Sequence, residues 1–127
     1  ILTPNEVELS QISGMPSGTI EEVTIAAQSL CNQGVGTVVT TLGSRGCLIV
    51  AKTCTEFIES FKVAAVDTTA AGDVFNGALV AELVRGEAIS DAAKVACAAA
   101  AIAVTEKGAI ASIPDRDAVL AFMSERL

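Results

Sequence analysis

Histidine, tryptophan and tyrosine are absent from the 127 residues, and phenylalanine occurs only four times. The absence of histidine excludes Ser-His-Asp and Cys-His catalysis and every metal site that depends on imidazole ligands. Because aromatic residues make up only 3% of the chain, its core must be built from Ala, Val, Leu and Ile. Apolar residues still reach 51%, so a sizeable core is expected and disorder is not.

Basic residues are also scarce, with 8 Lys and Arg against 15 Asp and Glu and a net charge of −7. This balance argues against a nucleic-acid partner, because such binding depends on clustered cations. The charge balance does not exclude phosphate ligands, since backbone amides can hold an anion without a cation. The longest apolar run, residues 95–104, is shorter than the roughly 20 residues that a membrane helix needs, so no membrane partner is expected.

The four cysteines show no C-x-x-C spacing, and no secretory signal is visible. We therefore expect scattered buried thiols in a reducing, cytoplasmic protein. The chain opens on an apolar pair without an initiator Met, which suggests the back part of something longer. We expect residues 1–127 to form one domain, or one piece of a domain.

Sequence patterns predict an α/β layered domain. Asn5 can cap a first helix, and Thr19 with Glu22 forms a capping-box pattern for a second. Strands are predicted over residues 37–42, 47–51 and 55–63, because these runs are rich in β-branched and apolar residues. Three helices follow, beginning near Asp73, at a Ser90 cap and near Asp115.

The segment VDTTAAGDVFNGALV (residues 66–80) carries the strongest chemical signal. Its small residues leave the backbone N–H groups of Ala71, Gly72 and Asp73 exposed at a helix start, where an anion is favoured. The Asp73 carboxylate would be unfavourable there unless it has a task, such as removing a proton from a hydroxyl that attacks a phosphoryl group. The alternative is that Asp73 only caps its helix.

Two further segments allow both a functional and a purely structural interpretation. TLGSRG (residues 41–46) could form a loop facing a nucleotide, with Arg45 supplying positive charge, or a plain hairpin turn. Asn5 and Glu8 have the spacing of a helix capping arrangement, or Glu8 could organise Mg²⁺ through water molecules. From local chemistry alone, the structural interpretation is preferred for both segments.

Four segments occur in order along the chain: TPNEVE, TLGSRG, AVDTTAAGDVFNGALV and AAAAIAVTEKGAIASIP. Together they resemble the carboxyl-terminal portion of the PfkB family of sugar kinases, most closely the ribokinases, over essentially the whole length. The resemblance implies a three-layer α/β/α fold of the ribokinase type, of which the lid and the sugar-binding half would be missing. It also implies ATP-dependent phosphorylation of D-ribose, and a homodimer for a full-length protein.

By this resemblance, Asp73 matches the catalytic base that deprotonates the sugar, and the amides of Ala71, Gly72 and Asp73 match the anion hole. Asn5 matches a residue that contacts the nucleotide, and Cys97 lies where ribokinases often place His or Asn near adenine. The loop along ATP matches Thr41, Leu42, Gly43, Ser44, Arg45 and Gly46.

Two cations are implied as well. Glu8 completes a motif associated with Mg²⁺, and a monovalent cation, usually K⁺, is implied beside the anion hole. The residues matching the K⁺ ligands are Asp67, Thr69, Ala103, Glu106, Gly108 and Ser112. Other family kinases, such as fructokinase or adenosine kinase, remain alternatives, and so does a nucleotide-binding fragment without catalysis.

Overall fold

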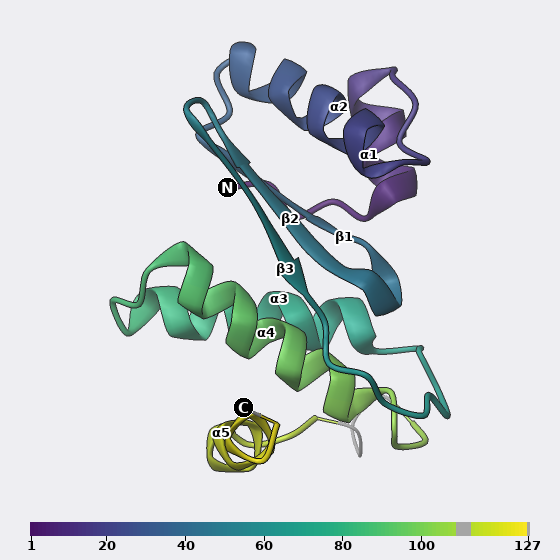
Figure 1. Cartoon of the computed structure of the whole chain (residues 1–127), viewed down its shortest axis with the longest axis vertical. Coiled ribbons are helices and arrows are strands. Elements are labelled where there is room, and N and C mark those ends of the chain that lie inside the picture. The colour runs from purple at the N-terminus through teal and green to yellow at the C-terminus, as the bar shows by residue number, and fades with distance from the viewer. Residues whose placement is uncertain (109–112, 127) are drawn as a thin grey trace. The chain divides into compact units, whose positions relative to one another are not determined.

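The computed structural model describes residues 1–108 and 113–126, and the chain forms two compact units, Ile1–Ile58 and Glu59–Leu127. The prediction for Ser112 lies outside the described residues. Figure 1 shows the helices and strands of both units. In the described part of the chain, no helix is both long and apolar enough to cross a membrane.

The first unit is built on a sheet with the strand order β1-β2-β3. Strands β1 (Thr37–Thr41) and β2 (Gly46–Ala51) form an antiparallel hairpin through a short 3₁₀ turn, η1 (Gly43–Arg45), and β3 (Cys54–Glu59) follows. Leu2 and Asn5 form parallel bridges to β1, so the start of the chain runs beside that strand.

Helices α1 (Glu6–Ser13) and α2 (Ile20–Asn32) pack against this sheet (Figure 1). Their buried residues join alternate residues of β1 and β2 in one apolar core, as the period of two in a strand requires. This core consists of Leu9, Val23, Ala26, Ala27, Leu30, Cys31, Val38, Leu42, Leu48 and Val50.

The second unit contains the helices α3 (Ala71–Val84), α4 (Ile89–Ala103) and α5 (Arg116–Ser124). Helix α4 buries mainly alanines, whose small side chains allow α3 and α5 to pack closely against it. Phe61 meets Phe122 of α5 edge to face, with 5.3 Å between ring centroids. The Arg126 guanidinium lies over the same Phe122 ring, 3.6 Å from its centroid.

The order and type of the predicted elements are confirmed. Asn5, Thr19 and Asp115 cap α1, α2 and α5 through their side chains. The Ser90 cap is wrong, because α4 begins one residue earlier and its N-cap is Ala88, whose side chain cannot accept a hydrogen bond. The third strand is shorter than predicted and ends at Glu59. All four cysteines lie in the described part of the chain and form no disulfide, as expected, although Cys54 is exposed rather than buried.

The uncapped start of α4 leads to a stability prediction. Ala88→Ser places a hydroxyl where it can accept a hydrogen bond from the first turn, and the extended backbone of Ala88 (φ −64°, ψ 150°) already suits an N-cap. We expect the free energy of unfolding to rise by about 1 kcal/mol in urea denaturation at an unchanged m-value. Ala88→Val, which adds bulk without an acceptor, should give no such gain.

Candidate active site

The start of α3 presents two backbone donors. Val74 N–H donates to Ala70 O at 2.9 Å, and Ala71 N–H donates to Thr68 O at 3.2 Å, which closes the turn before the helix. The prediction of an exposed Ala71 amide is therefore wrong, because the turn already uses it. Among the described residues, the N–H groups of Gly72 and Asp73 have no protein acceptor. Because they lie at the positive end of the helix dipole, they can bind an anion without rearrangement.

The Asp73 side chain is exposed in the first turn of α3. The alternative that Asp73 caps the helix is wrong, because the N-cap is Ala70 and Asp73 lies inside the helix. Within the part of the chain that the structure describes, the Asp73 carboxylate has no hydrogen bond or ion pair. It also lines a cavity of about 450 Å³ in the second unit. This carboxylate is therefore available to accept a proton.

Sequence reasoning missed a buried ion pair in the wall of the same cavity. Glu82 of α3 is 3% exposed and accepts hydrogen bonds from Arg116 at 2.7 and 3.2 Å, and Arg85 lies 3.9 Å away. The hydrogen bond from Arg116 is the main reason that the pKa of Glu82 is lowered. Glu82 follows Phe75 and Leu79 on one buried helical stripe, and a charge at such a position was the signal to notice.

Two of the residues matching the K⁺ ligands, Thr69 and Gly108, donate hydrogen bonds to a third, Asp67. Its Oδ1 accepts hydrogen bonds from the Thr69 hydroxyl and from Thr69 N–H, the latter at 2.9 Å, and its Oδ2 accepts from Gly108 N–H at 3.2 Å. These bonds favour the charged carboxylate and hold the pKa of Asp67 below its ordinary value, with the Thr69 hydroxyl as the largest cause. The pairing brings together segments 41 residues apart.

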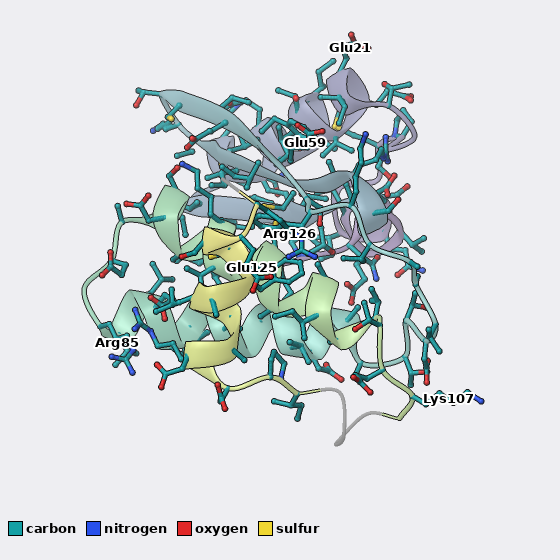
Figure 2. All side chains as sticks on the ribbon, turned by 60° about the horizontal axis from the view of Figure 1, so that its bottom comes forward. Glu21, Glu59, Arg85, Lys107, Glu125 and Arg126 are labelled. Carbon is teal, nitrogen blue, oxygen red and sulfur yellow. The ribbon has the colours of Figure 1, made fainter. Side chains whose placement is uncertain are left out.

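The carboxyl end of α4 completes this corner of the second unit. Val104 O accepts hydrogen bonds from the N–H groups of Val66 and Asp67 at 2.6 and 3.0 Å. Ala103 ends α4, and its carbonyl accepts from Glu106 N–H at 3.2 Å. In Figure 2, Lys107 and Arg85 lie at opposite ends of the α3–α4 pair, with this corner at the Lys107 end. The Asp67 carboxylate and the carbonyl groups of Ala103 and Val104 therefore lie at the end of the helix pair where α3 begins.

In the first unit, Asn5 and Glu8 form a complete capping box. Glu8 N–H donates to Asn5 Oδ1 at 2.8 Å, and Asn5 N–H donates to Glu8 Oε1 at 2.9 Å. The capping interpretation of this pair is confirmed. Glu8 is exposed, so its second oxygen still faces solvent and could hold a hydrated cation.

The TLGSRG segment is the β1–β2 hairpin turn, as the structural interpretation predicts. Leu42 N–H donates to Gly46 O at 2.8 Å across the turn. The Arg45 guanidinium is not free, because its Nη2 lies 2.7 Å from Glu6 Oε2. Asn5 is bridged to Thr41, so the predicted nucleotide residues of this unit lie at one edge of the sheet.

Cys97 belongs to the second unit, where it is buried in the middle of α4 with 3% of its surface exposed. It therefore offers little surface to a ligand. The described residues contain no group of three or more Cys, Asp and Glu side chains that could hold a metal ion. A divalent cation bound to the described residues would take most of its coordinating oxygens from water and from a bound ligand.

The family model described as pfkB family carbohydrate kinase matches residues 1–116. The chain belongs to the PfkB family of carbohydrate kinases. The ribokinase of Haemophilus influenzae is 41% identical over 123 residues, which is 97% of this chain and 40% of that enzyme. The chain thus spans less than half the length of this PfkB relative.

Solved PfkB structures share the fold. An Arabidopsis thaliana ribokinase complexed with ribose and ATP matches 96% of this chain with a TM-score of 0.91 and 38% identity, over 40% of its own length. A double-mutant Vibrio cholerae fructokinase with fructose, ADP and potassium ion bound matches 94% with a TM-score of 0.82 and 32% identity, over 39% of its length. The fold is therefore the ribokinase-type α/β fold, as predicted, over part of such a kinase.

The hydrogen bonds to Asp67 predict a dependence of stability on pH. Because the pKa of folded Asp67 lies below its ordinary 3.8, the stabilisation is complete above that value and is lost as pH falls through the lower folded pKa. The advantage of the wild type over Asp67→Asn should be constant near neutral pH and shrink below about pH 4. Urea denaturation over a pH series measures this difference.

Thr69→Val serves as the matched background, since it removes the hydroxyl that lowers the pKa most and leaves the two backbone donors. In the Thr69→Val background, the stability advantage of Asp67 over Asn should shrink less as pH falls. An advantage that stays constant down to the lowest measurable pH would contradict the hydrogen-bonded arrangement.

Proposed function

We propose that this chain supplies the nucleotide and phosphoryl-transfer side of an ATP-dependent sugar kinase that converts D-ribose to ribose 5-phosphate. One observation carries the proposal: the exposed Asp73 carboxylate, which has no partner among the described residues, lies beside two amide donors that are likewise unpaired there, at a helix start. The 41% identity to the Haemophilus ribokinase and the ribose and ATP bound to the Arabidopsis ribokinase support ribose as the sugar.

In this proposal Asp73 acts as the general base. Its carboxylate takes the proton of the sugar's hydroxymethyl group, the freed oxygen attacks the γ-phosphorus of ATP, and ADP leaves. The N–H groups of Gly72 and Asp73 donate to the oxygens of the transferring group, whose charge they stabilise. Ala71 N–H joins them only when its bond to Thr68 O opens.

The residues around Asp67 fit a K⁺ ion. A carboxylate, the Thr69 hydroxyl and the carbonyl groups of Ala103, Glu106 and Gly108 are all oxygen donors, which suits a weakly hydrated cation. Such an ion, as bound in the Vibrio fructokinase, would add positive charge near the start of α3. Asp67 already holds the preceding loop in place through its hydrogen bonds.

The first unit would contribute the remaining nucleotide contacts. Asn5 and the loop at residues 41–46 would lie along ATP, and Glu8 would hold Mg²⁺ through water, because its outer oxygen faces solvent. Mg²⁺ would supply charge neutralisation to the phosphates. Arg45 can turn towards a phosphate at little cost, because its pair with Glu6 is partly exposed and weak. Cys97 is 3% exposed, so adenine would meet little of its surface.

Fructose is the second candidate acceptor, because the Vibrio fructokinase is also 32% identical over nearly the whole chain. Among the described residues, Asp73 is the only proposed contact with the sugar. Selection of the acceptor therefore depends on residues other than these. A screen of ribose, deoxyribose, fructose and adenosine as acceptors, carried out on the longest natural protein that contains these residues, tests the assignment. Faster phosphorylation of any of the other three would replace ribose.

A chimera tests the base. Residues 1–127 replace the matching part of the Haemophilus ribokinase, and ribose-dependent ADP release is measured. Asp73→Asn should lower kcat about 10²- to 10⁴-fold, the usual contribution of a positioned general base, with KM for ATP nearly unchanged. Asp91→Asn, at an exposed carboxylate in the first turn of α4, serves as the control and should retain activity. Equal kcat values for the two variants would refute the role of Asp73.

The chain by itself should phosphorylate ribose poorly. It matches about 40% of the length of the ribokinases and supplies only one proposed sugar contact. We expect ATP turnover by the isolated 127 residues to be independent of ribose in a coupled ADP assay. Clear ribose-dependent turnover that Asp73→Asn abolishes would show that these residues alone hold the sugar.

A further inference from the structure

The ion pair between Glu6 and Arg45 joins two segments of the proposed nucleotide site. Glu6 is the first residue of α1, directly after Asn5, and Arg45 ends the 3₁₀ turn η1. Arg45 Nη2 lies 2.7 Å from Glu6 Oε2. Within the described residues, no other hydrogen bond or ion pair joins this turn to α1. The position of the Arg45 guanidinium in the absence of a ligand therefore depends on Glu6.

The pair is weak enough to be exchanged for another. Only one guanidinium nitrogen contacts Glu6, so the two parallel hydrogen bonds that make an arginine–carboxylate contact strong are absent. The side chains of Arg45 and Glu6 are 45% and 31% exposed, and water and salt weaken a pair at such exposure. The phosphate chain of a nucleotide carries several negative charges and accepts from two guanidinium nitrogens at once. It is therefore the stronger partner for Arg45.

The backbone on both sides of the pair is held independently of it. Leu42 N–H donates to Gly46 O at 2.8 Å across the turn. Arg45 N–H donates to Leu42 O at 3.2 Å, so the turn keeps its shape without the pair. On α1, the Glu6 carbonyl accepts a hydrogen bond from the Ser17 hydroxyl at 2.6 Å. A change of partner therefore needs only rotation of side-chain torsions, while the two segments stay in place.

We propose that Glu6 is a positioning residue that holds Arg45 until a nucleotide binds, and that a phosphate group of the nucleotide then replaces Glu6 as the partner of Arg45. This inference rests on the proposed function. Because the Glu6–Arg45 pair must break before the phosphate contact forms, Glu6 lowers the affinity for the nucleotide.

The same competition acts on the product. ADP also carries phosphates, so Glu6 competes for Arg45 while ADP is bound and takes it back as ADP leaves. Changes of this kind in an interface act mainly on the rate of dissociation. Glu6 therefore favours release of ADP, and its removal should strengthen inhibition by ADP as well as binding of ATP.

Nucleotide binding to the longest natural protein that contains these residues tests the exchange. Calorimetry measures the Kd of a non-hydrolysable ATP analogue with Mg²⁺, and of ADP with Mg²⁺. Glu6→Gln should tighten both about two- to fivefold, which corresponds to the strength of an exposed pair. Arg45→Gln should weaken both about tenfold or more, because a hydrogen bond between charged groups is lost. Misfolding of Glu6→Gln cannot imitate the expected result, because it would weaken binding.

Two further variants separate the exchange from a general effect of charge. Glu21→Gln removes the same charge from the first turn of α2, where Glu21 is exposed (Figure 2), and should leave both Kd values unchanged. In the Arg45→Gln background, Glu6→Gln should no longer tighten binding, because the pair is already broken. Equal tightening in both backgrounds would overturn the exchange. Tightening by Glu21→Gln, or weaker binding by Glu6→Gln alone, would overturn it as well.

Turnover of the same protein separates this inference from the proposed function. A wild type that does not bind the ATP analogue would refute both. If Asp73→Asn abolishes ribose-dependent turnover while Glu6→Gln leaves the Kd values unchanged, the kinase function stands and the exchange is overturned. Tighter binding by Glu6→Gln in a protein without sugar-dependent turnover would support the exchange and refute the assigned reaction.

Discussion

The geometry of the second unit depends on the Asp67 carboxylate. Its two oxygens accept three hydrogen bonds, two from Thr69 and one from Gly108, while Val104 O receives the N–H groups of Val66 and Asp67. These bonds fix the loop that leads into α3 against the end of α4. The direction of the first turn of α3, and with it the position of Asp73 and its neighbouring amides, follows from this contact.

The start of α3 remains chemically available because the sequence keeps its side chains small. Ala70 is the N-cap and has no side-chain acceptor, so no residue that the structure describes competes for the amides of Gly72 and Asp73. The same helix carries an exposed apolar stripe below Asp73. Helix α3 thus combines an anion-binding end with exposed apolar residues further along, Val80 and Val84.

In the first unit, structural and functional interpretations are compatible rather than exclusive. The Asn5–Glu8 capping box is present, yet it leaves one Glu8 oxygen in solvent. The hairpin turn is present, yet Arg45 is held only by a partly exposed pair with Glu6. The capping box and the weak ion pair hold these polar groups at one sheet edge, and they leave some of the groups available to bind a ligand.

Local patterns in the sequence were sufficient to predict the helices, the strands, the caps at Asn5 and Thr19 and two of the three free amides at the start of α3, because each depends on residues within about four positions of one another. The prediction of a Ser90 cap was wrong because serine is a common capping residue, whereas alanine is not. Ser90 is the second residue of α4, and the actual N-cap, Ala88, could not be recognised from its residue type. Only the tertiary structure decided the pairing of Asp67 with Gly108, the burial of Glu82 against Arg116 and the pairing of Arg45 with Glu6. The partners lie 34 to 41 residues apart in the sequence, and chain packing, rather than local propensity, brings them within hydrogen-bond distance.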